Sequence, residues 1–178
     1  LSIICDDIGI DVRELISLAN KHPRVNVLSP SCGVGGHCIS VDPWFIVNSA
    51  NGVAKIVEQA RRTNDYKADW VVEKIKKSAL KFERNNGFRP TIACMGLAFK
   101  PDINDLRESP ALYISEKISH LLNVVVVEPN IATHDSFHLV PYEQGLQADI
   151  CVYLVAHSQF DKLQLRAVDL DFCGLKEL

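Results

Sequence analysis

Apolar residues recur at three- and four-residue spacing through the first half of the chain, which is the pattern of amphipathic helices. Two short stretches, residues 1–8 and 12–19, are ended by Gly9 and by His22-Pro23. A longer stretch covers residues 53–82, with a possible break at Asn64-Asp65. The sequence therefore predicts a mainly helical first half.

The second half alternates short apolar runs with one helical pattern. Residues 91–96, 124–127 and 150–155 are typical of buried strands. Between the first two, Ser109-Pro110 forms a helix start signal for residues 111–122. Strand, helix and strand in this order predict a parallel sheet with right-handed crossovers, as in nucleotide-binding folds. The fold class is thus α/β, a helical part followed by a Rossmann-like part.

Charge divides the chain at the same place. Residues 1–88 contain 12 Lys and Arg against 10 Asp and Glu, whereas residues 89–178 contain 7 against 12. The turn-forming residues 85–87 lie at this seam. We therefore expect two domains, residues 1–88 and residues 89–178.

The composition narrows the function classes. The chain has 178 residues, 47% of them hydrophobic, and a net charge of −3, so it has no overall positive field for nucleic acid or an anionic membrane. Its six cysteines form no Cys-x-x-Cys pair, and its start lacks the features of a signal peptide. We expect a cytoplasmic protein. Because the chain opens inside a helical pattern, we expect it to be a fragment of a longer protein.

The most informative segment is Gly33–Pro43, GVGGHCISVDP. Glycines let the backbone approach a ligand closely, and the segment presents Cys38 as a candidate nucleophile beside His37. Asp42 is placed to orient or deprotonate a water. The spacing does not match Gly-x-Gly-x-x-Gly, and we expect no helix directly after it, which disfavours a phosphate cradle. A buried structural role for Cys38 is an equally good interpretation of the local sequence.

Two further patterns carry weaker signals. His134 and His138 have the spacing of a metal-binding helix, but they lie in loop-like sequence without a third ligand, so we predict no metal. Glu128 closes a strand as a ribose-binding acid would, yet it lies too far beyond Gly96 for that role. We interpret it as a strand-end acid in a degenerate nucleotide fold.

Three segments together resemble the nucleotide-sugar 6-dehydrogenases, which oxidise their substrate by four electrons with NAD. They are Gly33–Pro43, residues 96–102 (GLAFKPD) and residues 105–110 (DLRESP). The resemblance implies a helical middle domain that dimerises and a Rossmann-like domain that binds the UDP half of the substrate. No Gly-x-Gly-x-x-Gly occurs in the chain, so the N-terminal NAD domain of the family is expected to be missing.

The resemblance also assigns roles to residues. Cys38 is the nucleophile that holds the substrate as a thiohemiacetal and then a thioester, and Asp42 assists its hydrolysis. The substrate-binding residues are His22, Arg24, Gly35, Phe99 and Lys100, with Arg24 reaching across the dimer, and Arg107 contacts NAD. Each has a simpler alternative from local sequence alone: His22 as a helix stop, Arg24 as a surface charge, Arg107 as a partner of Asp105 or Glu108.

The substrate implied by residues 37 and 42–47 is UDP-N-acetyl-D-mannosamine. The sister sugars UDP-N-acetylglucosamine, UDP-glucose and GDP-mannose are alternatives, as is a non-catalytic module that dimerises and binds a nucleotide sugar. If Cys38 is the nucleophile, it should be exposed and reactive. Cys94 and Cys151 should be shielded in strands, and Cys32 should be a surface thiol.

Overall fold

The computed structural model describes residues 1–160 and 165–175. The helices and strands, in chain order, are α1 (Ser2–Ile8), α2 (Val12–Ala19), α3 (Asp42–Ser49), α4 (Lys55–Asn86), β1 (Thr91–Met95), α5 (Pro110–Ser119), β2 (Asn123–Val127), α6 (Tyr142–Gly145), β3 (Ile150–Tyr153) and β4 (Leu170–Asp171), with a 3-10 turn at Ser158–Phe160. Within the described residues, no helix combines the length and the apolar character needed to cross a membrane.

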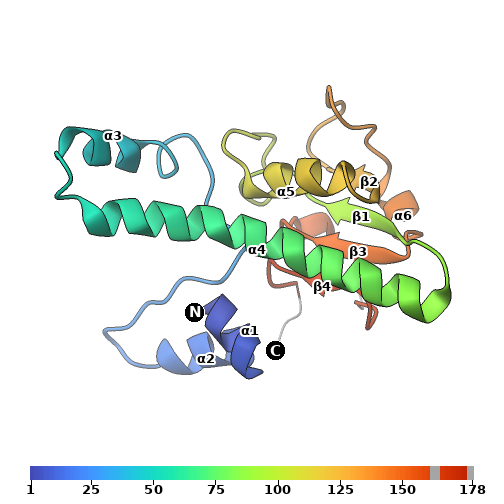
Figure 1. The fold of residues 1–178 in the computed structure, drawn as a ribbon, viewed down its shortest axis with the longest axis horizontal. Helices are drawn as coiled ribbons and strands as arrows, with labels where there is room; N and C mark the ends of the chain where they lie inside the picture. Colours follow the sequence, from blue (N-terminus) through green and yellow to red (C-terminus); the bar gives the residue numbers. More distant parts are fainter. Residues whose placement is uncertain (161–164, 176–178) are drawn as a thin grey trace.

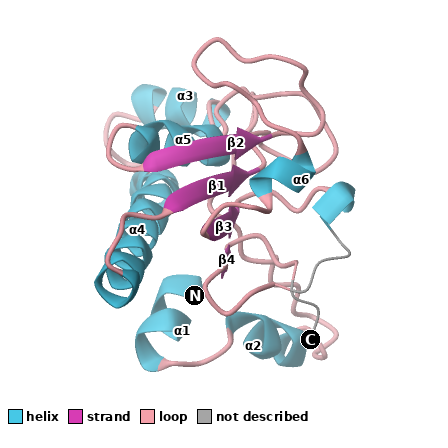
Figure 2. Ribbon diagram, turned by 90° about the vertical axis from the view of Figure 1, so that its right-hand side faces the viewer, coloured by secondary structure: helices cyan, strands magenta, loops and turns pink. Residues whose placement is uncertain are grey.

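The strands form one parallel sheet in the order β2-β1-β3-β4 (Figure 2). In its register, Cys94 of β1 lies between Val126 of β2 and Val152 of β3. The predicted α/β class and the parallel sheet are therefore confirmed. The carboxyl ends of β1, β2 and β3 meet at one edge, where ligands bind in such folds.

Alternate residues of the central strand face two different layers. Ile92 and Cys94 are fully buried in a core that they share with α4 and α5. Ala93 and Met95 point the other way, into a smaller core that includes Phe160 and is flanked by α6 (Figure 2). This period-two alternation, with both faces covered, explains why the strand is apolar at nearly every position.

The helix α4 runs through both halves of the molecule (Figure 1). Val71, Ile75 and Ala79 in its second half are buried in the core against the sheet. Its first half packs against α3. The helix ends at Asn86, where Gly87 takes a left-handed φ of 80°. The helix α4 packs against elements of both halves of the chain. The domain boundary after residue 88 therefore stays a prediction.

Two expectations about this region are wrong. The helix α4 does not break at Asn64-Asp65, because Asn64 uses its polar side chain on a neighbouring loop instead of on its own backbone. A helix, α3, does open directly after the glycine-rich segment. Pro43 suits its first turn, and the Asp42 N–H donates to the Cys38 carbonyl at 2.8 Å.

The helices α1 and α2 lie on the opposite side of α4 from α3 (Figure 1). An ion pair between Arg13 and Asp171, 3.2 Å, joins α2 to the end of β4. A second ion pair joins Lys74 of α4 to Asp6 of α1. The chain therefore places residues 20–30 and the cysteine loop, which we define as residues 33–41 around Cys38, on different sides of the long helix (Figure 1).

Candidate functional site

The glycine-rich segment before Cys38 packs directly on the second half of the chain. The Gly36 N–H donates to the Arg107 carbonyl at 3.1 Å. A Cβ at Gly35 would lie 2.4 Å from the Glu108 carbonyl oxygen, and one at Gly36 would lie 3.0 Å from the Phe99 ring. Only glycine fits this contact, so the glycines let the cysteine loop meet the segments that carry Phe99 and Arg107.

The backbone of residue 108 is unusual at the same contact. Glu108 has a φ of 52°, in the left-handed region that non-glycine residues rarely adopt. Its neighbour Ser109 caps α5 by accepting from the Leu112 N–H, and its hydroxyl donates to the Leu97 carbonyl at 2.6 Å. The strained residue is thus held between the helix start and the cysteine loop.

Asn64 fixes the other side of the loop. Its Oδ1 accepts from the Val34 N–H at 2.7 Å, and its Nδ2 donates to the Val34 carbonyl at 3.2 Å. One side chain of α4 thereby satisfies both backbone groups of a loop residue 30 positions earlier. Sequence reasoning missed this role because it interpreted the asparagine only as a helix breaker.

Cys38 is the most accessible thiol of the chain. It lies in the turn that leads into α3, and both its side chain and that of Asp42 are exposed. All six cysteines are described: Cys38 is exposed, Cys173 is half-buried and the others are buried. Burial raises the pKa of Cys94 to about 12. The accessible position agrees with that expected for a nucleophile.

The expectation for Cys32 is wrong. Its side chain is buried, and its Sγ donates to the Leu154 carbonyl at 3.4 Å. Burial raises the pKa of this thiol to about 12. The residue sits at the foot of the cysteine loop and packs into the core between α4 and the sheet. A short loop segment gave no periodicity from which this burial could be predicted.

Phe99, Lys100 and Arg107 lie in the segment between β1 and α5. Phe99 is half-buried against the glycines, while Lys100 is exposed. Arg107 pairs with Asp105, with Nη2 2.5 Å from Oδ2, which lowers the pKa of Asp105 to about 2. The pKa of Arg107 is raised by Asp105 and, to a smaller extent, by Cys38.

His22 and Arg24 do not join this group within one chain. They are exposed, and they belong to residues 20–30, the segment after α2 that lies on the far side of α4 from α3 (Figure 1). The His22 Nδ1 accepts from the Arg24 N–H at 3.3 Å. The structure thus brings together Gly35, Cys38, Phe99 and Arg107 but leaves the other two residues apart.

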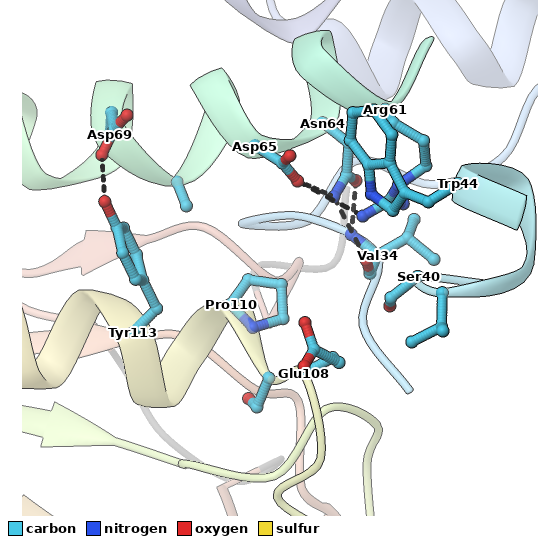
Figure 3. A pocket seen from close by; sticks show the side chains of 13 residues that line it. Val34, Ser40, Trp44, Arg61, Asn64, Asp65, Asp69, Glu108, Pro110 and Tyr113 are labelled. Carbon is cyan, nitrogen blue, oxygen red and sulfur yellow. Dashed lines mark hydrogen bonds and ion pairs between the residues drawn. The ribbon is translucent and has the colours of Figure 1, made fainter. Parts of the chain in front are cut away.

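A cleft of about 590 Å³ opens behind the cysteine loop, between α3, α4 and α5 (Figure 3). Ser40 and Val41 of the loop line one part of it, and Trp44 of α3 lines another. Arg61 is buried there and pairs with Asp65 at 3.2 Å. Among the described residues, the Ser40 Oγ and the Arg61 Nε have no hydrogen-bond partner. Sequence reasoning did not find this cleft, since Arg61 looks like one more charge on a helix.

The two histidines considered for a metal are in irregular structure. The His134 Nδ1 accepts from the Ser136 N–H at 3.1 Å, and its ring packs on Phe137. Among the described residues, no three or more His, Cys, Asp or Glu side chains are grouped so that they could hold a metal ion.

Comparisons with known proteins match both halves of the chain. Residues 1–66 match the central domain of the UDP-glucose/GDP-mannose dehydrogenase family, and residues 93–171 match the UDP-binding domain of that family. A UDP-N-acetyl-D-mannosamine dehydrogenase from Campylobacter jejuni is 50% identical over 97% of this chain and 44% of its own length. An NDP-N-acetyl-D-galactosaminuronic acid dehydrogenase from Ralstonia nicotianae is 49% identical over 94% of this chain and 41% of its own length.

The fold has a close counterpart among solved structures. The UDP-D-ManNAc dehydrogenase from Pyrococcus horikoshii superposes with a TM-score of 0.83 and 28% identity, over 98% of this chain and 43% of that one. The chain spans less than half the length of the relatives it matches. From the two matched domains, the first of which contains the cysteine loop, we conclude that the chain belongs to the UDP-glucose/GDP-mannose dehydrogenase family and comprises its central and UDP-binding domains.

Proposed function

We propose that this chain supplies the nucleophile and the UDP-sugar site for the NAD-dependent oxidation of UDP-N-acetyl-D-mannosamine to its uronic acid. The observation that carries the proposal is the contact of the cysteine loop with the UDP-binding domain. Gly35 and Gly36 admit no side chain against Glu108 and Phe99, so Cys38 is held beside the segment expected to bind the nucleotide.

The overall reaction converts a primary alcohol to a carboxylate. The sugar CH2OH, two NAD⁺ and one water give the carboxylate, two NADH and three protons. Cys38 attacks the aldehyde carbon that the first oxidation leaves and forms a C–S bond as a thiohemiacetal. After the second oxidation the carbon is a thioester, and water displaces the thiolate. Asp42, at the start of α3, is suited to take a proton from that water.

Each NAD⁺, when bound, would accept one hydride, so the two oxidations would use two NAD⁺ in succession. Of the described residues, we assign only Arg107 to contact the cofactor. The backbone amides at the end of β1, which hold pyrophosphate in dinucleotide-binding folds, are occupied by the Glu128 carboxylate. The main cofactor site is thus not expected in these two domains.

The substrate side uses the outer surface of the same loop region. Lys100 is exposed at the carboxyl end of β1 and can meet a phosphate oxygen with its ammonium group. The Phe99 ring packs beside the glycines, where the sugar would approach Cys38, and Gly35 would contact the nucleotide sugar through its backbone. We assign His22 and Arg24 to the site of a second copy in a homodimer, because the segment that follows α2 and carries them lies across α4 from α3, the helix that follows Cys38.

The choice of sugar rests on the relatives. The two curated relatives differ by one percentage point in identity and carry names for different N-acetylated sugars, mannosamine and galactosaminuronic acid. We propose UDP-N-acetyl-D-mannosamine as the preferred substrate. The sister sugars UDP-N-acetylglucosamine, UDP-glucose and GDP-mannose are the alternatives. A non-catalytic dimer that binds a nucleotide sugar is the second candidate function. All six cysteines are unpaired, which favours a reducing cytoplasm.

The test is a turnover assay on the intact protein as its source makes it. UDP-N-acetyl-D-mannosamine should give two NADH and one uronic acid per sugar, faster than the sister sugars. Cys38→Ser should lower acid formation by about 10³-fold or more, whereas Cys5→Ser should not. Binding of UDP-sugar without NADH formation would instead support the non-catalytic module, and equal rates with Cys38→Ser would overturn the role of Cys38.

A further inference from the structure

Two buried ionisable side chains lie under the segment that carries Phe99 and Lys100. Glu128 follows the end of β2, and His157 follows β3 in the loop before the 3-10 turn. Both side chains are completely buried, and the His157 Nε2 lies 3.1 Å from the Glu128 Oε2. Neither residue is used by the chemistry proposed above.

Every polar neighbour of the Glu128 carboxylate is a donor. Oε2 accepts from the Leu97 N–H at 2.7 Å and from the Ala98 N–H at 3.1 Å, besides His157. Oε1 accepts from the Asn130 N–H at 2.9 Å. Burial by itself raises the pKa of Glu128, but the hydrogen bonds from His157 and from these N–H groups outweigh it and lower the pKa. The carboxylate thus stays charged and saturates the amides at the end of β1.

The imidazole holds the far end of the same segment. Its Nδ1 accepts from the Asp102 N–H at 3.0 Å, which assigns the ring proton to Nε2, the atom facing Glu128. Asp102 itself has a φ of 58°, in the left-handed region. Its carboxylate accepts from the Ser158 N–H at 2.9 Å, so the turn is fixed from two directions. Residues 97–102 are therefore anchored at both ends.

We propose that Glu128 and His157 are positioning residues of the UDP-sugar site, which hold residues 97–102 so that Phe99 faces the cysteine loop and Lys100 faces outward. The inference rests on the proposed function. The same arrangement gives a reason why Lys100, and not the backbone amides at the end of β1, would bind the phosphate of the ligand. The amides that would otherwise receive the phosphate already bind an internal carboxylate.

The experiment compares variants of the chain in two measurements, the Kd for UDP by calorimetry and the amide hydrogen exchange of residues 96–103. Glu128→Gln replaces one acceptor oxygen by an NH2 group, which cannot accept a hydrogen bond from the N–H groups around it. His157→Gln keeps a donor toward Glu128 but loses the acceptor for Asp102, whereas His157→Asn keeps that acceptor. Lys100→Ala tests the phosphate contact itself.

A matched control is Asp169→Asn. Asp169 is also a buried carboxylate that accepts from a backbone N–H, that of Cys151 at 2.9 Å, but it lies at the opposite edge of the sheet. It reports the effect of losing a buried charge without touching residues 97–102.

Glu128→Gln and His157→Gln should each speed exchange in residues 96–103 and weaken UDP binding by about tenfold or more. His157→Asn should be closer to the wild type, and Asp169→Asn should change neither measurement by more than about twofold. If Lys100→Ala abolishes UDP binding while Glu128→Gln and His157→Gln leave both measurements unchanged, the positioning role is overturned and the site stands. If the wild-type chain does not bind UDP at all, the UDP site and the role assigned to the two residues are both overturned.

Discussion

At the scale of single residues, exposure decides which thiol can act. Cys38 is exposed, whereas Cys32 and Cys94 are buried and their pKa values are raised to about 12. A thiol with such a pKa holds almost no thiolate at neutral pH, and the thiolate is the reactive form. Iodoacetamide at pH 7 should therefore modify Cys38 first in the folded chain, as followed by peptide mass analysis.

The control for this labelling is the denatured chain, in which all six cysteines should react at similar rates. Bound UDP-sugar should slow the reaction of Cys38 in the folded chain. If Cys173, the half-buried thiol, reacts before Cys38, the assignment of the nucleophile by exposure is wrong.

A second prediction at this scale concerns the carboxylate beside Arg107. The hydrogen bond from Arg107 lowers the pKa of Asp105 to about 2. Because the folded-state pKa lies below the ordinary value, the pair favours the folded state at neutral pH, and this contribution is lost as pH falls from about 4 to about 2. Carbon-detected NMR titration should show this low pKa, and Arg107→Ala should return it toward about 3.9. An unchanged pKa in that variant would mean that the ion pair is absent in solution.

At the scale of elements, apolar patterning predicted most of the structure. The runs at 91–96, 124–127 and 150–155 became β1, β2 and β3, because a sheet covered on both faces needs apolar side chains at successive positions. Ser109-Pro110 correctly marked the start of α5, since both residues act locally, through a cap and a fixed φ.

The failures occur where tertiary contacts decide the local structure. The helix α3 has no buried residue, so it leaves no helical pattern of apolar positions to detect. Asn64 is tolerated inside α4 because both polar groups of its side chain form hydrogen bonds with the backbone of Val34. The partners Glu128 and His157 are 29 residues apart, and no local pattern predicts such a pair. The cysteine loop itself was found because its glycines and its cysteine are adjacent in sequence.

The contact between α4 and the loop gives the prediction at this scale. Asn64→Ala removes both hydrogen bonds to Val34 and should lower the free energy of unfolding by about 1–2 kcal/mol in urea titration. It should also speed hydrogen exchange in residues 33–40. Thr63→Ala is the control at the preceding residue, whose hydroxyl accepts a hydrogen bond from the exposed Gln59 side chain at 3.3 Å. Equal effects of the two substitutions on residues 33–40 would show that Asn64 does not hold the loop.

At the scale of the whole molecule, α4 divides the proposed site residues between two sides. The cysteine loop meets Phe99 and Arg107 on one side, and residues 20–30, which follow α2, lie on the other (Figure 1). Large apolar side chains are exposed on α1 and at the α3–α4 end, among them Ile8, Phe45 and Ile56. Such surfaces are typical of protein–protein contacts. Self-association would cover them and could bring Arg24 of one copy to Cys38 of another.

This arrangement is tested by mixing two inactive variants of the intact protein. Arg24→Ala removes the proposed contributed residue, and Cys38→Ser removes the nucleophile. If Arg24 acts across a dimer, a mixed dimer has one complete site, with Cys38 from one copy and Arg24 from the other. Refolding the two variants together at equal concentration should then restore about a quarter of the wild-type rate, since about half of the dimers are mixed and each has one working site. If Arg24 acts within its own copy, or has no role, mixing restores nothing beyond the sum of the separate rates. A monomer in sedimentation at about 50 μM would contradict the arrangement directly.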